Sequence, residues 1–290
     1  MDWVNAIVQG VLLGGLYALF ATGLSLIFGV MRVVNLAHGV LTLLAAFVAL
    51  VVTQHTNLSP LLTLPVVIPL MFVLGYVLQR WLINLTFSGG VLAPLLVSFG
   101  IAVIVENTLL KVFSADSRGL DAGSVENTSI HIAGGLSIGW LPLTIFLVAV
   151  TILAGLQLFF DRTMFGRAMR ATSDDHEAAQ LMAINDRHVY AISMGIALAI
   201  AGIAGVFVGV RTTFSPLDGS VLLIFAFEAV IIGGLGSLWG TLVGGVILGV
   251  SQTLGAHVSP SWFQLSGHLV FLAVLAVRPT GLFARQGSAT

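Results

Sequence analysis

Residues 33–79 read VVNLAHGVLTLLAAFVALVVTQHTNLSPLLTLPVVIPLMFVLGYVLQ and contain no Asp, Glu, Lys or Arg. A helix needs about 20 mostly apolar residues to cross the hydrocarbon core of a bilayer. The segment is long enough for two such helices, and the polar residues 54–60 divide it near its middle. It therefore predicts two membrane-spanning helices joined by a short turn.

The composition of the whole chain supports the same interpretation. Of 290 residues, 58% are hydrophobic and only 8% are charged, against about 25% charged residues in an ordinary soluble domain. So few charged side chains cannot cover a soluble fold of this size, and so high an apolar content excludes a disordered chain. The net charge of -1 gives no field that attracts nucleic acid, and the absence of cysteine excludes disulfides and thiolate chemistry.

The same length criterion predicts nine spans along the chain. They are residues 4–28, 36–53, 61–82, 91–112, 140–160, 189–210, 219–235, 239–256 and 262–277. The segments 219–235 and 262–277 are short enough to be half-helices, which leaves eight spans as an alternative. The fold class is therefore an all-α polytopic membrane helix bundle, a single transmembrane domain over residues 1–290.

Lys and Arg predict the orientation, because they collect in cytoplasmic connections. With the N-terminus outside, eight basic residues lie in inside connections and three in outside connections. The inside residues are Arg32, Arg80, Arg162, Arg167, Arg170, Arg187, Arg278 and Arg285, and the outside ones are Lys111, Arg118 and Arg211. This bias predicts an odd number of spans, with the C-terminus in the cytoplasm. No basic segment precedes the first span, so we expect that span to be retained rather than cleaved.

Two long connections separate the predicted spans. Residues 113–139 form an outside loop, either a solvated connector or a docking surface for an extracytoplasmic partner. Residues 161–188 form an inside loop that holds nine of the 23 charged residues.

The inside loop also predicts a short helix. Ser173 or Asp174 can cap its start, and residues 177–183 are strong helix formers. Ala178, Leu181 and Met182 fall on one apolar face. A helix that lies on lipid usually has a basic polar face, whereas this one is acidic, so a protein partner is the better interpretation.

Four separated segments resemble the branched-chain (hydrophobic) amino acid permeases of the LivH type, a family of ABC importer subunits. They are residues 23–39, residues 166–171 together with 177–182, residues 232–240 and residues 278–283. The resemblance covers nearly the whole chain. It departs at Ala183, where the family usually has glycine.

The resemblance implies an ATP-driven importer with the all-helical importer fold. The partners would be a LivM-like second permease, two cytoplasmic ABC ATPases and a solute-binding protein, in a bacterial inner membrane. The inside loop would carry the coupling helix that docks in a groove of an ATPase. The expected coupling residues are Gly166, Arg167, Arg170, Asp174, Asp175, Glu177, Ala178, Ala179, Leu181, Ile184 and Asn185.

The sequence contains no phosphate-binding loop of the form G-x-x-x-x-G-K-[ST], and its one lysine is Lys111. We therefore expect no catalytic site, metal or cofactor in this chain. ATP and magnesium would be used by the partner ATPases.

Four polar residues lie in or beside the predicted spans. A charge in lipid costs about 2.5–3.5 kcal/mol on insertion scales, so such groups normally face protein or a water path. Glu106 is either a subunit-packing acid or part of the translocation path. Glu228 is either structurally paired, with Arg211 as a possible partner, or part of the path. Asn35 and His38, at the inner turn between the first two spans, either cap helix ends or line an inner gate.

The predicted function is that of a permease subunit which forms part of the path for branched-chain or other hydrophobic amino acids, or similar small amides. The alternative is an ATP-independent secondary transporter or channel that uses Glu106 and Glu228. A structural scaffold would carry no solute.

Overall fold

The computed structural model describes residues 2–90, 92–123, 128–132 and 136–283. Nine helical segments in these residues are long and apolar enough to cross a membrane. They are built on α1 (Asp2–Met31), α2 (His38–Thr56), α3 (Leu64–Trp81), α4 (Leu92–Phe113), α6 (Trp140–Arg162), α9 (Asp186–Arg211), α10 (Gly219–Gly233), α11 (Leu238–Val258) and α12 (Phe263–Val277). The nine predicted spans are therefore confirmed, with ends that agree to within a few residues.

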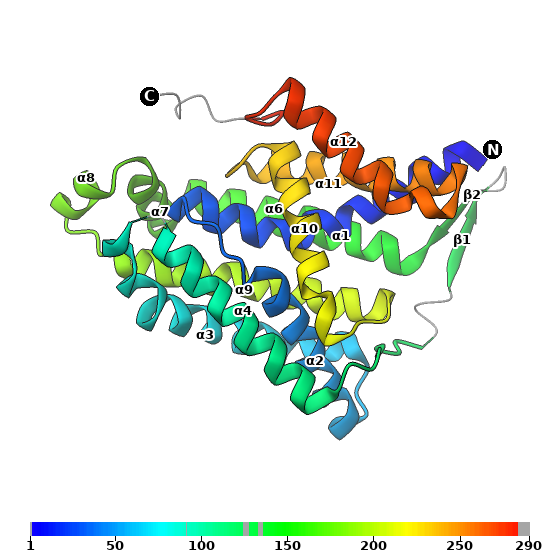
Figure 1. Cartoon of the computed structure of the whole chain (residues 1–290), viewed down its shortest axis with the longest axis horizontal. Coiled ribbons are helices and arrows are strands. Elements are labelled where there is room, and N and C mark those ends of the chain that lie inside the picture. The colour runs from blue at the N-terminus through cyan, green and yellow to red at the C-terminus, as the bar shows by residue number, and fades with distance from the viewer. Residues whose placement is uncertain (1, 91, 124–127, 133–135, 284–290) are drawn as a thin grey trace.

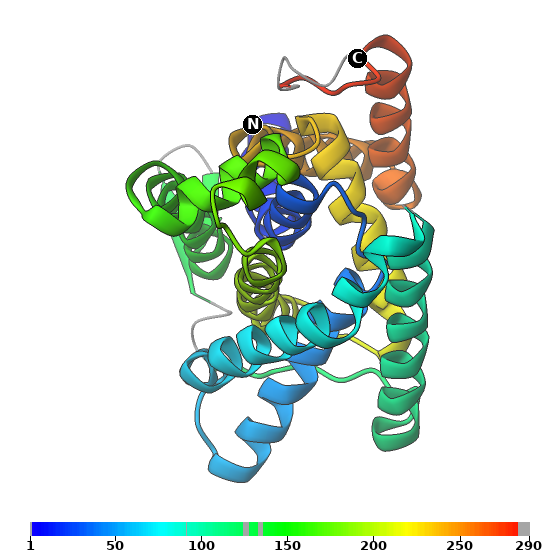
Figure 2. The same ribbon diagram turned by 90° about the vertical axis from the view of Figure 1, so that its left-hand side faces the viewer.

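Helices α1 and α9 form the centre of the bundle (Figure 2). Both are apolar around most of their circumference, as a helix surrounded by other helices requires. Helix α1 packs along α11 at glycines: a Cβ on Gly14 would overlap the backbone of Val246, and one on Gly249 would overlap the Gly10 carbonyl. Small residues at this spacing let the two backbones approach closely, which is how helices associate in lipid.

Helices α10 and α12 have 15 residues each, which at 1.5 Å per residue is about 22 Å and shorter than the hydrocarbon core. Each is preceded by a 3₁₀ turn that begins at a proline, η4 (Pro216–Asp218) and η5 (Pro260–Trp262). Turn and helix together make a span of 18 residues. Figure 1 shows α10 running obliquely across the front of α1.

Three further 3₁₀ turns extend or connect the spans. The turn η1 (Pro60–Thr63) leads into α3, and η2 (Ile83–Leu85) and η3 (Phe87–Gly89) join α3 to α4.

The predicted outside loop contains secondary structure among the residues that the structure describes. It contains the antiparallel hairpin of β1 (Ser129–Ile132) and β2 (Leu136–Gly139). The side chain of Gln9 donates a hydrogen bond to the Ser137 carbonyl at 2.8 Å. Backbone bonds between Arg118 and Phe214, at 2.8 and 2.7 Å, fasten the preceding segment to the bundle. Residues 124–127 and 133–135 of the loop, like Arg285 near the C-terminus, lie outside the described residues.

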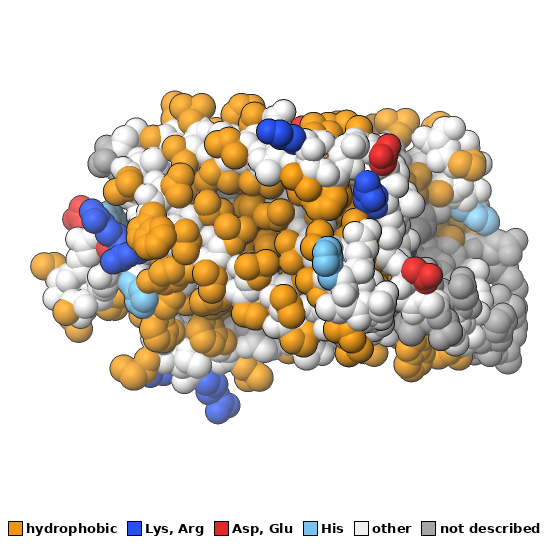
Figure 3. Space-filling view, turned by 90° about the horizontal axis from the view of Figure 1, so that it is seen from below, with side chains coloured by type: hydrophobic (Ala, Val, Ile, Leu, Met, Phe, Trp, Pro, Cys, Tyr) orange, Lys and Arg blue, Asp and Glu red, His pale blue; other side chains and the backbone are white. Residues whose placement is uncertain are grey.

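The hairpin and the start of α1 lie at one end of the bundle, and the short helices α7 (Met164–Asp174) and α8 (His176–Leu181) lie at the other (Figure 1). Figure 3 shows one side of the molecule, with hydrophobic side chains over its middle and a cluster of Lys and Arg at the α7–α8 end. An apolar band between polar ends is the surface that a bilayer requires.

Candidate functional site

The predicted inside loop forms two helices where the sequence predicted one. The Thr163 hydroxyl caps α7 by accepting from the Gly166 N–H at 2.9 Å. The Asp175 carboxylate caps α8 by accepting from the N–H groups of Glu177 and Ala178, both at 3.0 Å. The prediction that Ser173 or Asp174 caps the coupling helix is therefore wrong, because both residues complete the last turn of α7. The extended backbone of Asp175 separates the two helices.

The apolar side chains at the tip of α8 point away from the bundle. Leu181 is 88% exposed and Met182 78% exposed, and Ala178 is exposed as well, whereas Ala179 is buried. Charged side chains of the same two helices and of the residue between them are exposed as well: Arg167, Asp174, Asp175 and Glu177. Exposed apolar groups on a segment that also carries exposed charges are typical of a protein-docking surface.

Helix α8 ends in a sharp reversal of the chain. Ala183 has φ +61°, the left-handed region in which a Cβ is strained. Glycine adopts this conformation freely, which is a physical reason for the glycine expected at this position from the family resemblance; Ala183 carries the strain instead. Beyond it, the half-buried Ile184 donates its N–H to the Ala179 carbonyl at 3.1 Å, and the Asn185 side chain caps α9 at the His188 N–H.

Arg170 fastens α7 to the end of α6. Its Nη2 donates to the Phe160 carbonyl at 2.6 Å and to the Asp161 carboxylate at 2.8 Å. Gly166 permits the same close approach, because a Cβ at this position would overlap the backbone of Phe159 and Phe160.

A second attachment joins α7 to α1. The Ser173 hydroxyl donates to the Gly29 carbonyl at 2.5 Å, and Arg32 donates to the Ser173 carbonyl at 3.2 Å. The segment of α7 and α8 is thus attached to α6 and α1 through α7, whereas α8 makes no hydrogen bond to either span in the described structure.

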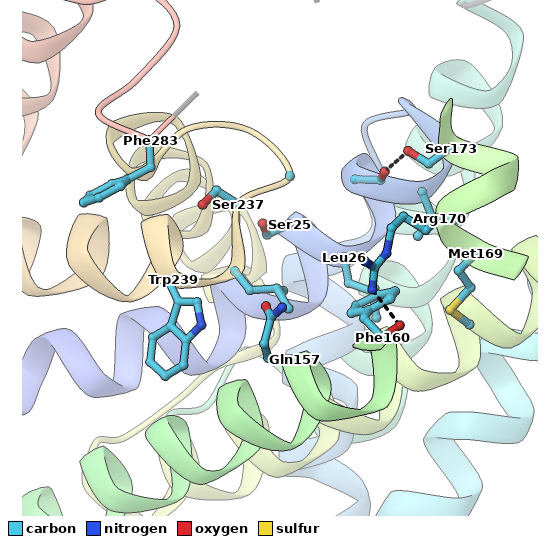
Figure 4. Close-up of a pocket in the computed structure, with 14 residues that line it drawn as sticks. Ser25, Leu26, Gln157, Phe160, Met169, Arg170, Ser173, Ser237, Trp239 and Phe283 are labelled. Carbon is cyan, nitrogen blue, oxygen red and sulfur yellow. Dashed lines mark hydrogen bonds between the residues drawn. The ribbon is translucent and has the colours of Figure 1, made fainter. Parts of the chain in front are cut away.

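A cavity of about 300 Å³ lies beside these attachments, between α1, α6, α7 and the start of α11. Figure 4 shows Ser25, Gln157, Arg170, Trp239 and Phe283 around it. The Ser25 hydroxyl is buried and makes no hydrogen bond within the described part of the chain.

The four sequence segments that carry the family resemblance all contribute to the wall of this cavity. Gly29 packs on Gly236, and the N–H groups of Leu282 and Phe283 donate to the carbonyls of Ile232 and Gly233, each at 3.0 Å. The sequence located these segments but did not predict that they meet, because their separation along the chain carries no information about their distance in space.

The model of the branched-chain amino acid transport system permease component matches residues 6–277. The chain belongs to this family. The permease is 28% identical over 295 residues to the high-affinity branched-chain amino acid transport system permease protein BraD of Pseudomonas aeruginosa. The matched region covers 98% of this chain and 96% of the relative. It is 27% identical to LivH of Escherichia coli K12, over 96% and 94% of the two chains.

More distant similarity extends to a fructose import permease, FrcC of Rhizobium meliloti, at 30% identity over 63% of this chain and 54% of the relative. No solved structure matches the permease significantly. The family is one of ABC importer permeases, which implies ATPase and solute-binding partners. This membership favours the importer over an ATP-independent carrier.

Asn35 and His38 of the permease both form hydrogen bonds to nearby backbone groups. The Asn35 side chain accepts from the Ala37 N–H at 3.0 Å, at the start of α2. His38 is buried, with its Nε2 2.7 Å from the Phe20 carbonyl of α1. His38 therefore joins the start of α2 to α1, whereas Asn35 bonds within the turn and donates to the Met194 sulfur of α9 at 3.7 Å. Neither residue lines the 300 Å³ cavity.

The two acids inside spans have different surroundings. Glu228, on α10, is hydrogen-bonded to His268 on α12 rather than to Arg211. The sequence analysis missed His268, since the two residues are 40 positions apart and no local pattern joins them. Glu106, on α4, is half-buried and has no hydrogen bond or ion pair to the residues that the structure describes.

The described residues contain no cluster of three or more His, Cys, Asp or Glu side chains that could hold a metal ion.

Proposed function

We propose that the permease carries branched-chain or other hydrophobic amino acids, or similar small amides. The names of its relatives support this substrate class, since those matched over nearly their full length are branched-chain amino acid permeases. The sugar permeases match over a smaller part of the chain. The buried side chains of the bundle are mostly hydrophobic, with a smaller number of polar ones among them, which suits a substrate selected mainly by a separate binding protein.

The permease works in a complex with a LivM-like second permease, two cytoplasmic ATPases and a solute-binding protein outside the membrane. The ATPases bind ATP and magnesium, and this chain hydrolyses nothing. The complex lies in a bacterial inner membrane, with the N-terminus of the permease outside and its C-terminus inside. The distribution of Lys and Arg supports this orientation, because α7 and α8 lie at the end of the bundle that is rich in arginine.

Residues 164–185 couple the permease to an ATPase. The observation that carries this role is the exposed apolar tip of α8 on a segment whose base is fixed to α6 and α1. A push on Leu181 and Met182 is transmitted through Arg170 to the end of α6. It is transmitted through Ser173 to the end of α1. The 300 Å³ cavity gives these helix ends room to move.

Asn35 and His38 act at the inner gate by holding the α1–α2 turn in place while the end of α1 moves. The Asn35 bond lies within that turn, and His38 joins the start of α2 to the Phe20 carbonyl inside α1.

The test is a double substitution, Glu177→Lys with Ala178→Trp, in the reconstituted importer. We expect solute uptake to be lost while ATP hydrolysis continues, because the altered tip no longer fits the ATPase. The matched control is Glu177→Asp with Ala178→Ser, which keeps charge and size and should retain uptake. Normal uptake by the first variant would refute the coupling role.

A further inference from the structure

Most exposed large side chains on the outer helices of the permease are apolar, including those on α4, α10 and α12. The exposed side chains along α3 include Val66, Leu70 and Val73, and those along α6 include Leu147 and Leu158. These faces suit contact with lipid chains. Helices α4, α10 and α12 lie together on another side of the bundle, at the front of Figure 1 and the right of Figure 2. That side carries both acids that lie inside spans.

Glu106 lies inside its span, where lipid chains offer its carboxylate no hydrogen-bond donor. It precedes the end of α4, at Phe113, by seven residues, which places it about 10 Å along the helix from that end. Its neighbours Val103 and Ile104 are exposed, so the face around it is open. A carboxylate at this depth requires a hydrogen-bond donor, and the part of this chain that the structure describes offers none within bonding distance.

The Glu228–His268 pair presents a second polar group on the same side. The Glu228 side chain is 5% exposed and the His268 side chain 40% exposed. His268 binds the acid through Nδ1 and stacks on Phe225, with ring centroids 6.2 Å apart. Its Nε2 makes no hydrogen bond among the described residues. The partly exposed imidazole therefore presents an unpaired nitrogen at the surface of α12, while the acid that it binds stays buried.

We propose that the face of α4, α10 and α12 packs against the second permease subunit, which supplies a donor to Glu106 and a hydrogen-bond partner to His268. This inference rests on the proposed function for the existence of that subunit. Lipid tails offer neither donor nor acceptor. A second chain that crosses the same bilayer can place a polar side chain at this depth, where lipid cannot. Glu106 is then a subunit-packing acid.

The permease contains no cysteine, so a single introduced cysteine can carry a benzophenone maleimide without background. The test sites are Ile104→Cys on α4 and Leu269→Cys on α12, and the controls are Leu70→Cys and Val73→Cys on α3; all four side chains are 47–67% exposed. Each variant is irradiated in the assembled importer, purified through its ATPase. We expect adducts with the second permease from α4 and α12 only.

An adduct from the α3 sites, or none from α4 and α12, would overturn the proposed face while leaving the importer assignment intact. A complex that contains the ATPase but no second permease would instead refute the partner in the proposed function.

The role of Glu106 itself is tested by Glu106→Leu, with Glu106→Gln as the variant that retains hydrogen bonding. We expect Glu106→Leu to lower the amount of second permease that co-purifies by about tenfold, with Glu106→Gln intermediate. Since neither substitution removes a hydrogen bond or ion pair to the described residues, the melting temperature of the isolated permease should not fall. Unchanged recovery with Glu106→Leu would contradict the proposal.

Discussion

The Ser173 hydroxyl donates a hydrogen bond of 2.5 Å to the carbonyl oxygen of Gly29. This bond joins the last turn of α7 to the last turns of α1, the helix at the centre of the bundle. A carbonyl at a helix end has no intrahelical partner, and Ser173 satisfies it from another helix. The coupling segment is therefore connected directly to the core of the permease.

Ser173→Ala should weaken the transmission of movement to α1. A hydrogen bond of this kind contributes about 1 kcal/mol, so we expect uptake per ATP hydrolysed to fall by about fivefold. Ser173→Thr keeps the hydroxyl and should retain most of the uptake. The measurement is solute uptake and ATP hydrolysis in the same proteoliposomes, and equal ratios in all three proteins would contradict the role of this bond.

Arg170 and Asp161 should contribute unequally to the attachment of α7. Their ion pair is about 40% exposed on both sides, and exposed ion pairs contribute little. The bond from Arg170 to the Phe160 carbonyl is 2.6 Å long and satisfies a helix end. We predict that Arg170→Ala increases proteolytic cleavage at residues 163–175 much more than Asp161→Ala does. Equal cleavage of the two variants would show that the ion pair dominates.

Ala183→Gly should stabilise the end of α8. The left-handed conformation costs a residue with a Cβ about 1–2 kcal/mol, and glycine avoids that cost but loses more chain entropy on folding. The expected net gain is up to about 1 kcal/mol. Hydrogen exchange of the backbone amides of α8 measures it, with Ala178→Gly as the control that should speed exchange. Faster exchange in Ala183→Gly would contradict the backbone geometry.

The glycines of the bundle should divide into two classes. Gly14 contacts the backbone of α11 so closely that a methyl group has no room, whereas a Cβ on Gly155 of α6 would meet nothing within 4 Å. Gly14→Ala should reduce the amount of folded permease, by steric overlap at a helix contact. Gly155→Ala should be neutral or slightly stabilising, because alanine has the higher helix propensity. Fluorescence-detected size-exclusion chromatography of both variants checks the contrast.

The spans could be predicted from the sequence because membrane thickness sets a length that each apolar segment must meet. The division of the coupling segment at Asp175 could not, since residues 164–174 include a glycine and three charged residues, and α7 is stabilised by contacts with α6 and α1. Helix propensity within residues 177–183 did locate α8. The exposure of Leu181 and Met182 agrees with the face predicted from their spacing.

Contacts between segments that are far apart in the chain could not be predicted from the sequence. The pairing of Glu228 with His268 and the convergence of four segments on one cavity depend on how helices pack, and a single sequence records no such distances. Arg211 was a reasonable partner for Glu228 by charge. The structure instead pairs Glu228 with a histidine on a helix whose sequence is otherwise typical of lipid contact.

The coupling role of residues 164–185 requires α8 to lie in the cytoplasm and to contact an ATPase. Because the chain lacks cysteine, Met182→Cys can be labelled with a membrane-impermeant maleimide. We predict no labelling in intact cells, strong labelling in inverted vesicles stripped of the ATPase, and protection when the ATPase is restored. Labelling of Met182→Cys from outside intact cells would contradict the account.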